Sequence, residues 1–445
     1  MVPRKYLGIF AALVSCFVLW GLLNNMTDNL VPAFQKIFGT TQSTAGFVQI
    51  SFYGSYSVIA LFASLLIQKK GYRMGVLTGL GVYVLGALLY IPACIAQSFW
   101  TYIVGIFIVA GGCAVLETTC NPYILALGER ETAVRRLNFA QMFNPVGSLA
   151  GILLAQQLIL GHIDEAKETA LFWVCVPYVG LCAIAALIWV YFFRSQASEI
   201  DTVEQEKTEF KAIFSILAHS PRWYLGVVTQ VFYVGVQIAA WTWMNVYCVK
   251  ELGVTSKTAA SYYLIAISCF IVCRWVATFL MKYINPARLM AFFAACAVAC
   301  SLGVMYLPTK VLFTVGGLPF AANIICLVMM SGFMSLMFPT IYGIALGGID
   351  PKAHKIGAAG LIMAIVGGAL LTPWMADIIG NANSLWCSLT SSFDATWDDT
   401  LKLSQVSLRA SFIVPVICFA VVGIYALLFN APEGGEKSAA ESAAA

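Results

Sequence analysis

Residues 99–127 read FWTYIVGIFIVAGGCAVLETTCNPYILAL, and Glu117 is the only acidic or basic side chain in this run. About 20 apolar residues in a helix suffice to cross the hydrocarbon core of a bilayer. A carboxylic acid at that depth is costly, so such residues usually face a bundle interior or a water-filled cavity and take part in function. The run therefore predicts a membrane-spanning helix that carries a functional acid.

The rest of the chain repeats this pattern. Hydrophobic residues make up 60% of the 445 residues and charged residues only 10%, which is more apolar surface than one soluble core can bury. Each apolar run is far longer than a barrel strand of about 10 residues, and a helix satisfies its own backbone hydrogen bonds in lipid. We expect an all-α polytopic membrane protein with twelve transmembrane helices, near residues 7–34, 45–67, 74–96, 99–127, 138–160, 171–193, 223–248, 258–281, 287–307, 321–347, 357–379 and 408–429.

Lysine and arginine positions test this count independently, because cytoplasmic loops carry an excess of both residues. With both termini placed inside, and basic residues at span ends counted with the adjoining loops, 17 of the 25 basic residues fall on the cytoplasmic side, seven fall outside, and Arg274 alone lies well inside a span. The segment 380–407, which we expect outside, holds Cys387 and Lys402. The net charge of +4 therefore reflects topology and predicts no nucleic-acid partner.

A charged stretch divides the predicted helices into two sets of six. The inner loop LIQKKGYRMGVL after the second span has a positional counterpart, LMKYINPARLM, after the eighth. We expect an N-terminal six-helix half at 1–193, a cytoplasmic linker at 194–222, a C-terminal six-helix half at 223–430 and a disordered tail at 431–445. Two such halves are the plan of the major facilitator superfamily, in which the substrate site lies near the middle of the membrane, between the halves.

Several kinds of chemistry are absent from the sequence. It contains no GxxxxGK[ST] phosphate-binding loop and no metal-ligand cluster, so we expect no cofactor and no metal site. The three histidines, His162, His219 and His354, fall outside the predicted spans, so proton chemistry within the membrane must use carboxylates. No nucleophile with a neighbouring base accompanies the acids, which argues against an intramembrane enzyme. The remaining possibilities are transport driven by an ion gradient and facilitated diffusion without a coupled ion.

Polar side chains recur at three- or four-residue spacing, and hence on one helix face, in several predicted spans. Amides supply a donor and an acceptor together, which suits the hydroxyls of a sugar, and an aromatic ring packs against the apolar face of a sugar ring. An amide can equally link two helices, and an aromatic ring can simply pack. A sugar site is the leading interpretation, with Asn25 in the first span, Asn138, Gln141 and Asn144 in the fifth, and Gln237 and Trp241 in the seventh.

Several of these strings also carry a resemblance. NNMTDNLVPAFQ at 24–35, LETTCNPYILALG at 116–128, RLNFAQMFN at 136–144 and FMSLMFPTIYGIALG at 333–347 resemble the fucose/galactose/glucose:proton symporter family of the major facilitator superfamily. The resemblance implies that Asp28 and Glu117 are that family's two essential membrane acids, and that Gln141 and Asn144 line its cavity. Two departures lie near the implied pocket, where the fucose-symporter pattern has Asn instead of Thr27 and Tyr instead of Phe338.

The sequence and the resemblance together predict a proton-coupled monosaccharide importer that works by alternating access, with L-fucose as the favoured sugar. Burial disfavours the charged form of Glu117, so this acid is expected to take up a proton readily. Asp28 either passes the proton on or binds sugar hydroxyls, and Phe338 joins the candidate sugar contacts. We expect a monomer in the bacterial cytoplasmic membrane, with lipid around it, both termini in the cytoplasm, and sugar and protons as its substrates.

Other functions use the same features. A facilitative or sodium-coupled transporter of glucose, galactose or N-acetylglucosamine has the same fold, and proton flux distinguishes it from a proton symporter. The alternative from another functional class is a membrane receptor that transports nothing. Uptake of a labelled sugar would exclude the receptor, and absence of uptake would support it.

Overall fold

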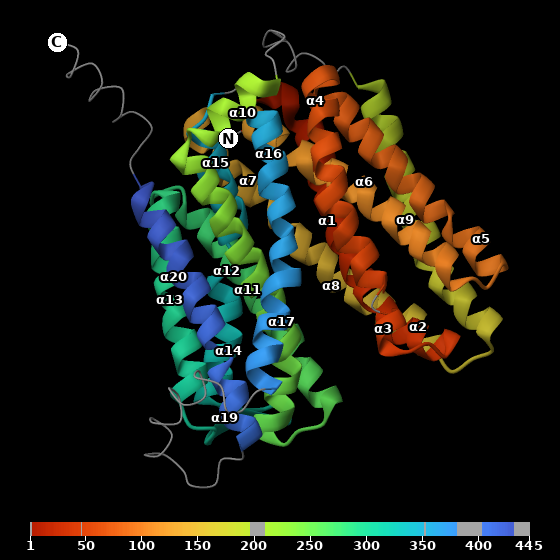
Figure 1. Cartoon of the computed structure of the whole chain (residues 1–445), viewed down its shortest axis with the longest axis vertical. Coiled ribbons are helices and arrows are strands. Elements are labelled where there is room, and N and C mark those ends of the chain that lie inside the picture. Colours follow the sequence, from red (N-terminus) through yellow and green to blue (C-terminus); the bar gives the residue numbers. More distant parts are fainter. Residues whose placement is uncertain (1, 46, 196–209, 351–352, 381–402, 431–445) are drawn as a thin grey trace. The chain divides into compact units, whose positions relative to one another are not determined.

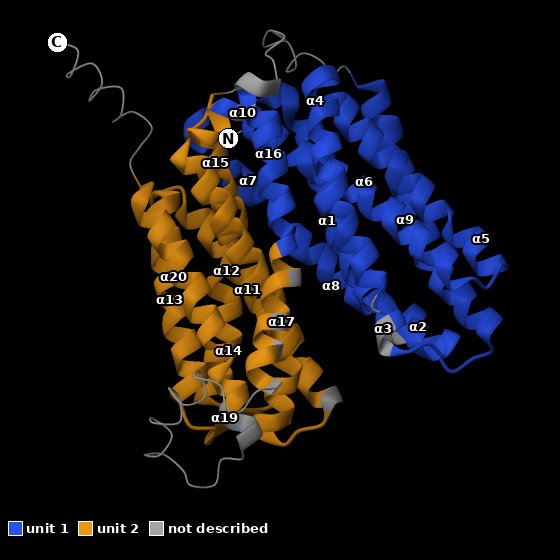
Figure 2. Ribbon diagram, viewed as in Figure 1, with its two compact units in different colours: residues 1–215, 351–366 blue, residues 216–350, 367–445 orange. Residues whose placement is uncertain are grey.

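The computed structural model describes residues 2–45, 47–195, 210–350, 353–380 and 403–430. The chain forms two compact units: unit 1 comprises residues 1–215 and 351–366, and unit 2 comprises residues 216–350 and 367–445 (Figure 2). The domain boundaries predicted from the sequence stay a prediction. Residues 196–209 of the expected linker and the expected tail, 431–445, lie outside the described residues, as does Cys387.

Unit 1 is built from long, apolar helices and several short ones (Figure 1). Its elements are η1 (Arg4–Tyr6), α1 (Leu7–Asp28), α2 (Leu30–Phe38), α3 (Gln42–Ala45), α4 (Phe47–Leu88), α5 (Tyr90–Ile95), α6 (Phe99–Ala126), η2 (Arg130–Thr132), α7 (Ala133–Gln141), α8 (Asn144–Leu154), η3 (Ala155–Ile159), η4 (Leu160–His162), α9 (Lys167–Arg194), α16 (His354–Met363) and η7 (Ala364–Val366). Helix α10 (Phe210–Ala218) crosses the boundary between the units.

Among the described residues, eleven helical segments are long and apolar enough to cross a membrane. One of them, Phe47–Ile95, has 49 residues and contains two of the twelve predicted spans. Its helix α4 breaks at Gly71, where φ is 80° and ψ is 174°. Only glycine adopts this backbone conformation easily, so the sequence KKGYR ends one span and starts the next. The eleven segments therefore account for the predicted count of twelve.

Unit 2 holds the remaining elements, most of them helices (Figure 1). They are α11 (Pro221–Leu252), α12 (Ser256–Leu280), α13 (Pro286–Tyr306), β1 (Val311–Val315), β2 (Leu318–Ala321), α14 (Ala322–Phe333), α15 (Met337–Gly347), α17 (Gly367–Gly380), α19 (Leu403–Ala410) and α20 (Ile413–Leu428). The antiparallel hairpin β1–β2 lies in a predicted loop and was not expected. Its turn residues, Gly316 and Gly317, both have positive φ, which is the geometry of a tight hairpin turn.

Several predicted spans are divided between helices rather than continuous, and the fifth and the tenth are two of them. The fifth divides between α7 and α8, and the tenth divides between α14 and α15. Proline explains both breaks, because it has no N–H to donate to the carbonyl four residues earlier. Pro145 leaves the carbonyl of Gln141 without its helical donor, and Pro339 does the same to the carbonyl of Ser335.

Candidate functional site

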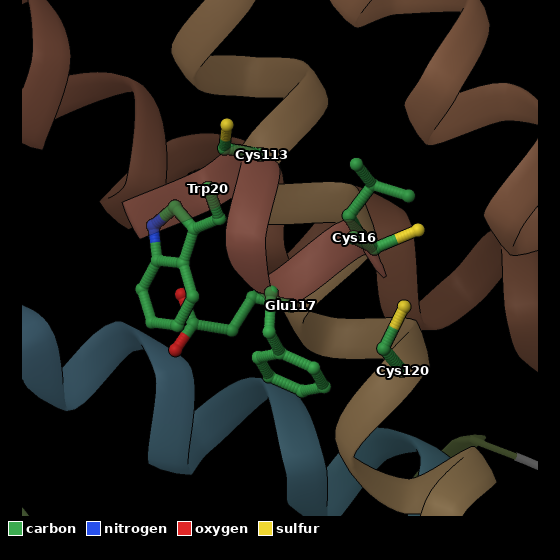
Figure 3. Close-up of a pocket in the computed structure, with 7 residues that line it drawn as sticks. Cys16, Trp20, Cys113, Glu117 and Cys120 are labelled. Atoms are coloured by element: carbon green, nitrogen blue, oxygen red, sulfur yellow. The ribbon is translucent and has the colours of Figure 1, made fainter. Parts of the chain in front are cut away.

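Glu117 lies in the middle of α6 and is buried, with only 2% of its surface exposed. Neither carboxylate oxygen has a hydrogen-bond partner among the described residues. The acid borders a small pocket between α1 and α6, which has room for about one water molecule (Figure 3). Its lining is otherwise apolar or weakly polar and consists of Cys16, Phe17, Trp20, Cys113, Leu116 and Cys120.

The close-up shows what surrounds the acid. The Trp20 ring lies beside the Glu117 carboxylate, while the thiols of Cys16 and Cys120 lie on the other side of the pocket (Figure 3). A carboxylate without a donor in such a setting loses its hydration and gains nothing in return, so its charged form is strongly disfavoured until a proton or a ligand arrives. The pocket is thus suited to proton binding and to a ligand hydroxyl.

Helix α6 is fixed at both ends, which sets the position of Glu117. At the start, the Ser98 side chain accepts a hydrogen bond from the backbone N–H of Thr101 and caps the helix. At the end, the fully buried Arg136 guanidinium donates to the carbonyl oxygens of Ile124 and Leu125, at 2.7 and 2.6 Å. These carbonyls belong to the last turn, where a helix lacks donors of its own.

The predicted site residues of α1 lie near its end. Asp28 is the last residue of α1 and is half-buried. Asn25 is half-buried as well, and its amide donates to the carbonyl of Gly21 within the same helix, at 3.2 Å. Helix α8 crosses α1 at Gly21, where a Cβ atom would lie 2.1 Å from the carbonyl oxygen of Asn144. The Asn144 amide itself donates to the carbonyl of Phe17 in α1, at 3.2 Å.

The amides of α6 and α7 form a buried pair. Gln141 donates to the side-chain oxygen of Asn121 at 2.7 Å, and Asn121 in turn donates to the Glu117 carbonyl at 3.0 Å. Asn138 is fully buried, and its amide donates to the carbonyl of Val134. The structure therefore uses Gln141 and Asn144 to link helices around the Glu117 segment. Their role as sugar contacts stays a prediction.

In unit 2 the two predicted site residues of the seventh span, Gln237 and Trp241, lie on α11. Gln237 is half-buried there, and the Trp241 indole donates to the Ser331 hydroxyl of α14 at 2.9 Å. Phe338 begins the turn after the break in the tenth span, and its ring stacks on Tyr342 with centroids 6.3 Å apart. These positions lie in one unit, whereas the two acids lie in the other.

Arg274 and Gln230 are among the buried polar residues of unit 2 that were not predicted as site residues. Arg274 is 4% exposed, donates from Nε to the carbonyl of Ser335 and lies over the Phe270 ring. Pro339 leaves this same carbonyl without a helical donor. The Arg274 guanidinium therefore supplies the hydrogen bond that the helix lacks at its break. Gln230 is fully buried, and neither of its amide atoms has a partner among the described residues. Arg274 had a sequence signal, since it is the only basic residue that lies well inside a predicted span, away from its ends.

No group of three or more His, Cys, Asp or Glu side chains in the described part of the chain could hold a metal ion.

Comparison with known proteins decides the family. The family model described as Major Facilitator Superfamily matches residues 7–372. The chain belongs to the major facilitator superfamily. It is 36% identical to the L-fucose-proton symporter of Haemophilus influenzae, over 96% of this chain and 97% of that protein. It is 25% identical to the glucose/galactose transporter of Brucella abortus, over 96% of this chain and 95% of that one.

A solved structure agrees with these matches. The crystal structure of the Escherichia coli fucose:proton symporter is similar with a TM-score of 0.81 and 29% identity, and the match covers 96% of this chain and all of that one. The predicted fold class and the predicted resemblance are confirmed. This major facilitator superfamily member is a multi-pass membrane protein whose relatives are transporters.

Proposed function

We propose that this chain imports L-fucose together with protons by alternating access. The observation that carries the proposal is Glu117, a buried carboxylate without a hydrogen-bond partner among the described residues, beside a pocket that also contains an aromatic ring. The relatives named as L-fucose-proton symporters support the choice of both substrates.

The mechanism follows from the cost of burying a charge. With Glu117 ionised, the pocket holds an unpaired negative charge, which is unfavourable in a low-dielectric surrounding. A proton removes that cost, and the neutral acid then offers both a donor and an acceptor to a sugar hydroxyl. Protonation and sugar binding together permit the change of access, and release of the sugar on the inside is followed by loss of the proton.

Asp28 is the second acid of the proposal. It lies half-buried at the end of α1, in the polar sequence NNMTDN, whereas Glu117 is only 2% exposed. We therefore assign the exchange of protons with water to Asp28. The proposed sugar contacts are amides and rings that can meet hydroxyls and apolar ring faces: Asn25, Asn138, Gln141, Asn144, Gln237, Trp241 and Phe338.

The setting of the protein is part of the proposal. We place it as a monomer in the bacterial cytoplasmic membrane with both termini inside, because the lysine and arginine residues favour that orientation. It acts as a transporter and not as an enzyme, and it needs no cofactor.

A substrate panel in proteoliposomes tests this function. An imposed proton gradient should drive accumulation of L-fucose, and L-fucose added without a gradient should carry protons inward. D-galactose, D-glucose and N-acetylglucosamine serve as competing sugars, and a sodium gradient serves as the competing driving force. Faster uptake of D-glucose than of L-fucose would assign another sugar, and uptake without proton flux would exclude the symporter.

A further inference from the structure

The hairpin β1–β2 carries an apolar surface that the described part of unit 2 leaves uncovered. Every residue of β1 is exposed. Four of them are apolar, with 47% to 60% of their surface exposed: Val311, Leu312, Phe313 and Val315. An antiparallel sheet that packs on a protein core buries alternate side chains of each strand. Because the exposure of β1 does not alternate, neither of its faces packs on the described residues of unit 2.

The second strand fixes the depth of the hairpin. The Tyr262 hydroxyl of α12 donates to the Pro319 carbonyl of β2 at 2.5 Å. Tyr262 is the fifth residue of Thr258–Leu280, a segment long and apolar enough to cross a membrane, and thus lies about 6 Å along the helix from its start. The headgroup layer is about 5 to 7 Å thick on each side of the hydrocarbon. Strand β2 therefore lies near the boundary between headgroups and hydrocarbon, and β1 pairs with it about 5 Å away.

A row of aromatic rings points to the same depth. The Phe313 ring of β1 stacks on the ring of Phe320, its partner in β2, with centroids 5.4 Å apart. The Phe320 ring in turn meets the Tyr262 ring edge-on at 5.5 Å. The row leads from the exposed strand to α12 and ends in a tyrosine, a residue enriched where membrane meets water.

The charges of this segment suit a phospholipid surface. Lys310 is the only charged residue in 307–321, and it is exposed directly before β1. A lysine at this depth lays its apolar stem along the hydrocarbon and extends its ammonium to the lipid phosphates. In water, by contrast, an apolar strand with an open edge is a site of unwanted pairing between chains.

We propose that the hairpin β1–β2 is a membrane-surface anchor. The apolar side chains of β1 insert into the boundary layer of the bilayer beside α12, and Lys310 meets the phosphate of a lipid headgroup. The anchor holds the adjoining ends of α13 and α14 at a constant depth. The bilayer and not a second copy of the chain covers β1, because strand pairing with a second copy would cover the edge of β1 and leave its two apolar faces exposed.

Spin labelling of the full-length protein, in nanodiscs of phosphatidylcholine and phosphatidylglycerol, measures this depth. A nitroxide is attached at Leu312→Cys or at Val315→Cys in a Cys387→Ser background. Its collisions with oxygen, which concentrates in hydrocarbon, are compared with its collisions with a polar nickel complex, which stays in water. The matched control is Glu165→Cys, at an exposed turn residue. The Cys387→Ser chain alone gives the background from the remaining cysteines, which are buried or half-buried where the structure describes them.

The ratio of oxygen to nickel collisions should be several-fold higher at Leu312 and at Val315 than at Glu165. Both substitutions should keep the thermal stability, because both side chains are exposed, and each position checks the other. Nickel collisions as frequent as at Glu165 would place β1 in water and overturn the anchor. Rare collisions with both reagents would show that protein covers β1, which overturns it equally. Neither result depends on the sugar that the protein transports.

Discussion

Replacing Glu251 with glutamine should destabilise unit 2 strongly. Glu251 near the end of α11 and Arg409 in α19 form a buried ion pair, with 0% and 4% of their side chains exposed. The guanidinium donates to one carboxylate oxygen from Nε at 3.0 Å and to the other from Nη2 at 2.7 Å. The same cluster holds the Thr309 hydroxyl, which accepts from Arg409, and Asn323, which donates to Thr309.

The size of the effect follows from this geometry. In Glu251→Gln one carboxylate oxygen becomes an NH2 group that faces a guanidinium donor, and the arginine charge stays buried without its counter-ion. Removing one partner of a buried ion pair costs about 3 to 5 kcal/mol. Lys36 and Asp164 supply the matched control, because their ion pair is exposed, at 52% and 80%. Asp164→Asn should change stability by at most about 1 kcal/mol.

Chemical denaturation of the detergent-solubilised protein measures both variants side by side. The unfolding midpoint of Glu251→Gln should fall clearly below that of Asp164→Asn and of the wild type. The double variant Glu251→Gln, Arg409→Met should lose less than the sum of the two single variants, because it removes the orphaned charge. Equal midpoints for Glu251→Gln and Asp164→Asn would refute the reasoning.

Three further predictions concern transport and topology. Gln141→Ala and Asn144→Ala should each weaken L-fucose binding by about tenfold, the effect of roughly 1.4 kcal/mol, as measured by calorimetry; unchanged affinity removes the residue from the sugar site. Phe338→Tyr should alter the uptake ratio of L-fucose to L-galactose while proton coupling persists, because it adds a hydroxyl to an apolar wall; a constant ratio removes Phe338 from the pocket. Cys387 should react with an impermeant maleimide on intact cells and Cys269 should not, and the reverse would overturn the predicted topology.

Long apolar runs made most of the fold predictable. The run 99–127 became α6, Phe99–Ala126, because a span of that length has no other way to satisfy its backbone in lipid. The breaks were missed although their signals were present. Pro145 and Pro339 each remove one backbone donor, but hydropathy alone does not register that loss. The hairpin at Val311–Ala321 was missed because it is too short and too exposed to affect a search for spans.

The sequence predicts those residues of the candidate site that differ in polarity from the apolar run around them. Glu117 is conspicuous in an apolar run, whereas Cys16, Trp20 and Cys113 resemble ordinary span residues. Only the packing of α1 on α6 places them around the acid. The pairing of Gln141 with Asn121 likewise depends on how α7 folds back on α6, which side-chain spacing within one helix cannot reveal. Arg274 was visible in the sequence, but its partner carbonyl appears only once the helix is seen to break.

Glu117→Gln in proteoliposomes tests the central claim most directly. One proton moving down a gradient equivalent to 100 mV supplies about 2.3 kcal/mol, which supports roughly 50-fold accumulation of a sugar in the wild type. The amide has the shape of the protonated acid but cannot release a proton, so the variant should exchange labelled L-fucose across the membrane without accumulating it. Accumulation by Glu117→Gln at the wild-type level, with the proton gradient as the only driving force, would contradict the account.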